Sequence, residues 1–297
     1  MGNDGHIAEG KAIISGLDRQ VQVRGLKSRL FRLVVILLSL ISTLPLLLIL
    51  FYIFKKGISA INWHFLVSLP KPVGETGGGI SNAIVGTLML IGVAAVLAIP
   101  VGILIGIYLS ETPKGRIAYN CRLAVDVLQG IPSIVIGIII YEWVVVPMGG
   151  PSSFSGSIAL GLMMLPAIIK STEETLKLIP EALKESSLAL GVPYYTTVLR
   201  VIVPSGMSGI MNGVLLSIAR VVGETAPLLF TAFGNHWMNT NIFKPTSSLP
   251  LIIFKYATSP YTEGHKLAWG ASLILIIMIL VLNLITKLVE RKWRTPF

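Results

Sequence analysis

Two ionisable side chains lie four positions apart within a long apolar stretch of this sequence. Arg220 and Glu224 are the only charged residues between Ser208 and Gly234. An arginine at the centre of a membrane costs about 2.5–3.5 kcal/mol, so such residues usually face a bundle interior or a wet cavity. Positions four apart share one face of a helix, and the two side chains could therefore pair. We interpret them as candidates for a translocation pathway or gate.

Two interpretations of Arg220 and Glu224 stay open. In one, the pair is structural and holds two helices or two subunits together. In the other, Arg220 is the positive partner of an anion that crosses a low-dielectric region, and Glu224 occupies it when the anion is absent. Gly223 and Pro227 favour a flexible helix at this point, which fits a mobile gate.

Other charges near the ends of apolar runs predict local ion pairs. Lys170 and Glu174 have helical spacing, and so do Arg122 and Asp126. Lys170 is in addition a second candidate contact for an exiting anion. The sequence predicts no metal site, because Cys121 is the only cysteine and the four histidines have no ligand spacing.

A polar stretch predicts a compact projection built from a short helix and a sharp turn. Pro180 suits the first position of a helix and Gly191 suits its C-terminal cap, so we expect a helix over Glu181–Leu190. With Glu185 in the helix and Pro204 after the turn, such a projection could fit a cleft of another subunit and transmit its motion. The alternative is an amphipathic helix that packs on its own protein.

The composition indicates which elements position these residues. Of the 297 residues, 53% are hydrophobic and 13% are charged, and the mean hydropathy is +0.79. Soluble domains carry about 25% charged residues, so a soluble enzyme and a disordered chain are both excluded. A membrane-spanning helix needs about 20 apolar residues. Six segments qualify and predict an all-α polytopic membrane protein: Leu33–Phe54, Ala83–Leu109, Leu123–Pro147, Phe154–Ile169, Ser208–Gly234 and Leu267–Thr286.

The basic residues predict the topology. Most of the 24 lysines and arginines fall in the tails and in alternate loops, which places the N- and C-termini in the cytoplasm. The chain is then divided as follows: a basic cytoplasmic tail at 1–32, a first transmembrane helix at 33–56, an outer segment at 57–82, a permease core at 83–286 with five further helices and a cytoplasmic loop near 180–204, and a basic C-tail at 287–297.

The cytoplasmic loop resembles the EAA loop of binding-protein-dependent ABC importers. The pattern of that family is E-A-A-x3-G-x9-I-x-L-P. Glu185, Gly191 and Pro204 keep its spacing, although serines replace both alanines and valines replace Ile and Leu. The resemblance implies that the loop couples the membrane helices to a cytosolic ATPase. The chain itself binds no cofactor in this view, and ATP and Mg belong to the partner ATPase.

Four stretches resemble the PstA-type permeases of phosphate ABC importers. They are Gly79–Thr87, Leu128–Gly137, Ala219–Ala232 and Ser248–Leu251. The resemblance covers the chain from Gly77 onward. It implies a type I importer permease fold in a bacterial or archaeal inner membrane, with inorganic phosphate as substrate. The implied partners are a PstC-type permease, a PstB-type ATPase dimer and a PstS-type phosphate-binding protein.

Three other functions are alternatives to a phosphate permease. A permease for another oxyanion, such as molybdate or sulfate, would share most of these features. A secondary anion transporter or channel would be expected to show an internal repeat, and we find none. A membrane enzyme would need a polar constellation near one interface. A nucleotide site of the chain's own is not expected, because Gly5–Lys11 has P-loop spacing but is followed by Ala12.

Overall fold

The computed structural model describes residues 4–72, 75 and 77–293. The backbone divides into two units, residues 1–55 and 56–297. The described part of the first unit is most of α1, one helix over Asp4–Gly57. Its segment Lys27–Gly57 is long and apolar enough to cross a membrane, as the sequence predicts for 33–56. The helix also continues toward the N-terminus through much of the basic segment before it.

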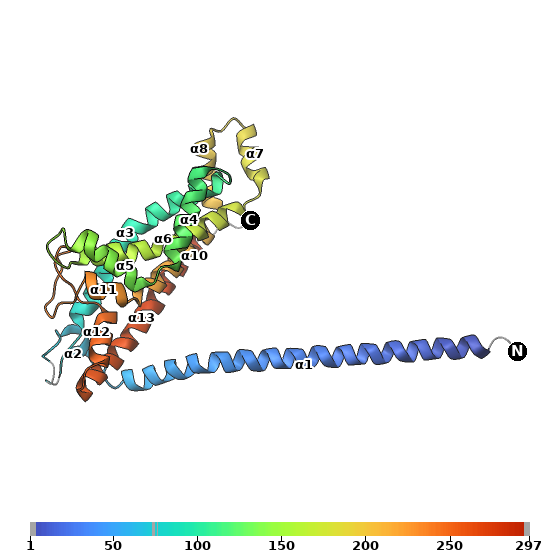
Figure 1. Cartoon of the computed structure of the whole chain (residues 1–297), viewed down its shortest axis with the longest axis horizontal. Coiled ribbons are helices and arrows are strands. Elements are labelled where there is room, and N and C mark those ends of the chain that lie inside the picture. The colour runs from blue at the N-terminus through green and yellow to red at the C-terminus, as the bar shows by residue number, and fades with distance from the viewer. Residues whose placement is uncertain (1–3, 73–74, 76, 294–297) are drawn as a thin grey trace. The chain divides into compact units, whose positions relative to one another are not determined.

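The second unit is a bundle of helices centred on α6, which spans Ser153–Lys177. The helix α3, over Ser81–Glu111, and the helix α10, over Met207–Val222, both pack against it. The helix α13, over Thr262–Trp293, packs against α10 and against α12, which spans Leu249–Ala257. At the other end of the unit from α12 lie α7 and α8 (Figure 1).

Glycine pairs allow α3 and α10 to approach α6 closely. Gly102 and Gly106 of α3 face Ile168 and Thr172 of α6, and a Cβ at Gly106 would lie 2.5 Å from the Cβ of Thr172. On the other side, Gly209 and Gly213 of α10 face Thr175 and Ser171 of α6. Both pairs have the G-x-x-x-G spacing by which membrane helices bring their backbones together. As a result, α6 is the most deeply buried of the long apolar helices.

The third predicted span, Leu123–Pro147, is broken rather than continuous. The chain forms α4 over Arg116–Gly130, then α5 over Ser133–Ile140, and ends in the π-helical turn η1 over Tyr141–Val145. The two parts meet at an angle of 107°. Pro132 explains the break, because proline has no N–H and excludes the helical conformation for the residue before it. Ile131 is accordingly extended.

The fifth predicted span, Ser208–Gly234, is broken after Val222, and a separate bend precedes it. Before α10 the chain forms α7 over Glu181–Ala189, α8 over Tyr194–Thr197, the π-helical turn η2 over Val198–Ile202, and α9 over Val203–Ser205. The segment Tyr194–Ser205 meets α10 at 67°. After α10 ends, a second short helix, α11, covers Ala226–Thr231. Counted as one span each, the two bent pairs and the four long apolar helices give up to six spans in the described residues.

Four hydrophobic clusters lie in the described part of the second unit, and the two with the most buried residues show how its helices are joined. The larger joins α3, α5, α6, α10 and α11, with Leu160, Met164 and Leu228 almost fully buried. The other joins α12 to α13 and to the short helix α2, over Trp63–Val67, through buried Phe65 and Leu249. The described residues contain no strands, only one isolated bridge between Phe233 and Thr246. The predicted all-α class is confirmed.

Candidate functional site

Arg220 lies in the last turn of α10, and its side chain is exposed. Leu216, one turn earlier on the same helix, is 70% exposed. The opposite face of α10 packs against the bundle, so Arg220 and Leu216 share the face that this chain leaves uncovered. We expect another molecule to cover this face. The cost of leaving arginine in hydrocarbon makes a wet pathway or a partner subunit the favoured environment for this face.

Glu224 does not share a helical face with Arg220. The helix α10 ends at Val222, and Gly223 forms its C-cap. The described residues include no ion pair or hydrogen bond between Arg220 and Glu224. The i,i+4 pairing that the spacing predicts is therefore wrong, because the helix stops between the two residues. Glu224 instead lies, partly buried, in the break before α11.

Pro227 explains why a new helix begins after this break. It lies in the first turn of α11, where a missing N–H costs nothing. Its backbone is packed against Gly137 of α5, and a Cβ at Gly137 would lie 2.7 Å from the Cα of Pro227. The two short helices that follow the two breaks, α5 and α11, are thereby packed on each other.

Lys170 is held by α4. Its Nζ lies 2.7 Å from Oδ1 of Asp126 and donates a hydrogen bond of 2.6 Å to Oε1 of Gln129. The spacing predicts Glu174 as the partner of Lys170, but the structure pairs Lys170 with Asp126. The ammonium lies where α4 and α6 meet, and its charge is already matched by a half-exposed carboxylate.

Arg122 joins three helices, a role that its sequence neighbours do not reveal. Its Nε donates to Oε1 of Glu173 on α6 at 2.8 Å, and one terminal nitrogen donates to the carbonyl of Leu109 in α3 at 2.7 Å. Lys177 donates to the same carboxylate at 2.6 Å. Arg122 therefore does not form the pair with Asp126 that its spacing predicts. Its partners Leu109 and Glu173 lie 13 and 51 residues away in the sequence. This cluster fixes the same end of α3, α4 and α6.

The segment predicted as a compact projection has the expected helix and turn. The helix α7 begins at Glu181, directly after Pro180, and ends at Ala189. Gly191 has φ +78°, a conformation that favours glycine. The chain returns through helical turns, not through an extended segment, and Pro204 lies in α9. Glu185 is exposed on α7.

Large apolar side chains are exposed on this segment. The four most relevant are Leu188, Leu190, Tyr195 and Leu199, with exposed fractions of 39%, 84%, 68% and 57%. Exposed apolar residues that gather on one segment mark an interaction site. Leu188 and Leu190 precede the segment Tyr194–Ser205, which belongs to a candidate span, so we expect a protein partner at these two leucines.

The projection is braced against α3. Lys184 of α7 and the hydroxyl of Tyr194 both donate to the carboxylate of Glu111, the last residue of α3. Burial alone would lower the pKa of Lys184, but the hydrogen bonds to Glu111 and Tyr194 outweigh it, and the pKa is raised. Inside the loop, Ser187 and Thr197 share a buried hydrogen bond of 2.9 Å. These contacts join α7 and α8 directly to the end of α3.

Comparisons with known proteins place this architecture among transport components. Residues 98–295 match the family "Binding-protein-dependent transport system inner membrane component". The chain is 40% identical over 245 residues to the phosphate transport system permease protein PstA of Yersinia pestis, covering 82% of this chain and 83% of that one. It is 36% identical over 261 residues to the probable phosphate transport system permease protein PstA of Methanocaldococcus jannaschii, covering 88% and 92%.

Two solved structures have the same fold. An inward-facing structure of the methionine ABC transporter MetNI matches with a TM-score of 0.61 at 21% identity, covering 73% of this chain and 96% of that one. A bacterial ABC transporter that imports alginate matches with a TM-score of 0.62 at 14% identity, covering 86% and 95%. The helical arrangement of this chain is therefore a known fold.

Proposed function

Because the chain belongs to the family of binding-protein-dependent transport system inner membrane components, we propose that it is a PstA-type permease subunit of an ATP-driven importer for inorganic phosphate. It is a multi-pass membrane subunit that works with a separate ATPase and a binding protein. The observation that carries the choice of phosphate is the extended identity to phosphate permeases, 40% over most of both chains.

In this proposal the chain provides half of the translocation pathway. A PstC-type permease provides the other half, a PstB-type ATPase dimer binds the cytoplasmic face, and a PstS-type protein delivers phosphate. Both termini lie in the cytoplasm of a bacterial or archaeal cell, as the basic tails favour. The ATPase supplies ATP and Mg, and this chain carries out no covalent step.

Arg220 is the residue proposed to meet phosphate within the membrane. A phosphate ion loses hydrogen bonds to water when it leaves the aqueous phase. The guanidinium of Arg220 can replace some of these bonds with two parallel N–H donors. Its exposure on a surface left open by this chain supports that role. Glu224 directly follows Gly223, the C-cap of α10. A change in the backbone conformation of Gly223 would therefore move the carboxylate of Glu224.

The segment Glu181–Pro204 is proposed to couple the ATPase to the pathway. Its exposed apolar side chains provide the contact surface, and the brace from Lys184 and Tyr194 to Glu111 provides the connection to α3. In the same proposal, motion of α7 moves α3 and, through η2 and the 67° bend, also α10.

Reconstitution tests the proposal. The complete complex in proteoliposomes should accumulate radiolabelled phosphate only with ATP and the binding protein. An excess of sulfate or molybdate should leave uptake unchanged. ATP-independent uptake by this chain alone would contradict an importer, and uptake suppressed by molybdate or sulfate would favour the alternative oxyanion permease.

Replacing Gly191 by valine should uncouple ATP hydrolysis from transport. An added Cβ at Gly191 would meet no atom within 4 Å, so the only effect is strain of a positive φ, about 1–2 kcal/mol and more for a branched side chain. We expect phosphate uptake to fall about tenfold while ATPase activity persists. The matched control is Gly191→Asn, because asparagine tolerates this conformation. Equal uptake by the valine and asparagine variants would contradict a conformational role for the turn.

A further inference from the structure

A cavity of about 420 Å³ opens between α11, α12 and the loop that joins them. It lies at the end of the second unit where α11, α12 and α2 gather, opposite α7 and α8 (Figure 1). Leu229 of α11, Lys255 and Tyr256 of α12, and His236 of the loop contribute to its wall. If the coupling segment faces the cytoplasm, this cavity faces the outer side of the membrane.

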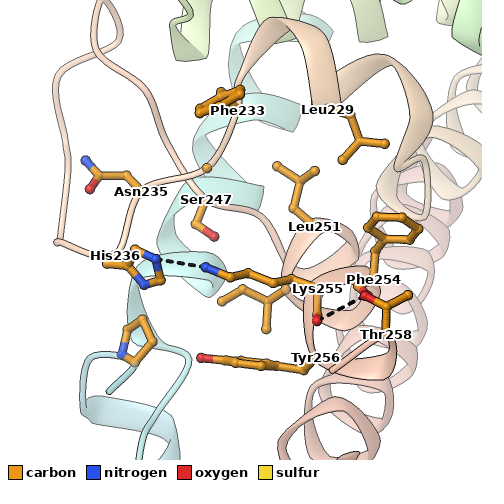
Figure 2. A pocket seen from close by; sticks show the side chains of 13 residues that line it. Leu229, Phe233, Asn235, His236, Ser247, Leu251, Phe254, Lys255, Tyr256 and Thr258 are labelled. Carbon is orange, nitrogen blue, oxygen red and sulfur yellow. Dashed lines mark hydrogen bonds between the residues drawn. The ribbon is translucent and has the colours of Figure 1, made fainter. Parts of the chain in front are cut away.

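Two nitrogen-bearing side chains meet in the cavity. Nζ of Lys255 lies 2.8 Å from Nε2 of His236, and Figure 2 shows the two side chains pointing toward one another across the opening. An ammonium can only donate, so Nε2 accepts and the ring proton of neutral His236 lies on Nδ1. Ser247 adds a hydroxyl to the same wall.

No carboxylate lines this cavity in the described part of the chain. The described ion pairs do not include Lys255, whose ammonium has His236 as its side-chain partner. Glu75 and Glu263 line a neighbouring cavity that shares Tyr256 with this one. Burial and then the charge of Lys255 lower the pKa of His236. The cavity therefore concentrates hydrogen-bond donors and positive charge without a matching anion.

The loop that carries His236 is held rigidly. Phe233 has φ +61° and is followed by Gly234 with φ +88°. For a bulky residue this conformation is strained, and such strain collects at functional sites. Buried Asn82 of α3 donates to the carbonyl of Asn235 at 2.6 Å, and Asn235 in turn accepts from the backbone N–H of Trp237 at 3.0 Å. His236 lies between two anchored residues.

We propose that this cavity is a binding site for a small tetrahedral oxyanion, held by Lys255, His236 and Ser247. Resting on the proposed function, the ligand is inorganic phosphate in transit. Its position favours transit over storage, because Leu229 in its wall belongs to α11, whose six residues rise about 9 Å. The other end of α11 adjoins the break that carries Glu224, and this break follows α10, whose last turn carries Arg220. The helix α11 thus joins the segment that follows Arg220 to the wall of this cavity.

Binding of inorganic phosphate to the assembled permease–ATPase complex, measured without the binding protein, tests the site. The complex is purified in dodecyl maltoside, which contains no phosphate. Lys255→Gln should weaken binding about tenfold, the loss expected for one charge-assisted hydrogen bond. Lys244→Gln, which removes an exposed lysine from the same loop, should change binding less than about twofold.

A local readout separates this site from Arg220. With ¹⁵N-labelled histidine, phosphate should shift the ring resonance of His236 and raise its pKa, because an anion offsets burial and the charge of Lys255. The shift should persist in Arg220→Gln and disappear in Lys255→Gln. An unshifted His236 resonance, or wild-type binding by Lys255→Gln, would overturn the site even where ATP-driven phosphate uptake is normal.

A lipid headgroup offers the same chemistry as free phosphate. Repeating the titration in nanodiscs containing phosphatidylglycerol distinguishes the two sources. Unchanged affinity for inorganic phosphate supports a transit site. Displacement of phosphate by the lipid would overturn transit and assign the cavity to a headgroup.

Discussion

Replacing Arg220 by glutamine is expected to reduce ATP-driven phosphate uptake by about a hundredfold without preventing assembly of the complex. Removing one partner of a desolvated charge pair costs about 2–5 kcal/mol, which corresponds to this range. Assembly should survive because Arg220 is exposed and forms none of the ion pairs among the described residues. The measurement is the initial rate of phosphate uptake by proteoliposomes, normalised to purified complex.

Two variants separate charge from packing at this position. Arg220→Lys keeps the charge but loses the paired donors, and we expect intermediate uptake. Leu216→Ala changes the same exposed face one turn away without touching charge and should leave uptake nearly unchanged. If Arg220→Gln transports at the wild-type rate, the residue is dispensable and the pathway lies elsewhere. If Leu216→Ala fails equally, the face is an interface and not a pathway.

Replacing Gly213 by valine is expected to prevent recovery of folded protein. A Cβ at this position would lie 2.2 Å from the Cβ of Ser171, so α10 would have to move away from α6. Overpacking of this kind costs about 3 kcal/mol, a large fraction of the stability of a domain. The yield of monodisperse complex and its thermal midpoint measure the effect.

Gly92 provides the matched control for this substitution. It lies in α3, is exposed, and an added Cβ would meet no atom within 4 Å. Gly92→Ala should leave the thermal midpoint unchanged or raise it, because alanine favours helix more than glycine does. Normal folding of Gly213→Val would show that α10 and α6 can separate, which would contradict the close packing of this pair.

The helices could be predicted from the sequence, but the bend inside Leu123–Pro147 could not. Hydropathy reports where apolar residues lie and not the direction of the backbone, so Leu123–Pro147 reads as one segment although it bends by 107° at Ile131 and Pro132. Pro45 and Pro100 lie inside continuous helices. A proline alone therefore does not predict a break, because neighbouring helices decide whether the chain can turn there.

The site could be predicted in part. Gly191 and the helix before it follow from local rules of capping, which is why α7 appears within one residue of its predicted end. The partners of Arg122 and Lys170 depend on how α3, α4 and α6 meet, and no spacing within one helix contains that information. The pair His236 and Lys255 is similarly hidden, since 19 residues separate them and each looks like an ordinary loop or helix residue.

Each of the two π-helical turns is a place where the helical register can change by one residue. A π turn holds one residue more than an α turn, and each bent pair contains one. If the wide turn migrates by one position, one residue passes from one flanking helix to the other, which advances the chain by about 1.5 Å and rotates it by about 100°. Every backbone hydrogen bond can be re-formed after each such step. A change of register at these turns is therefore counted in whole residues, unlike a bend, which can take any angle.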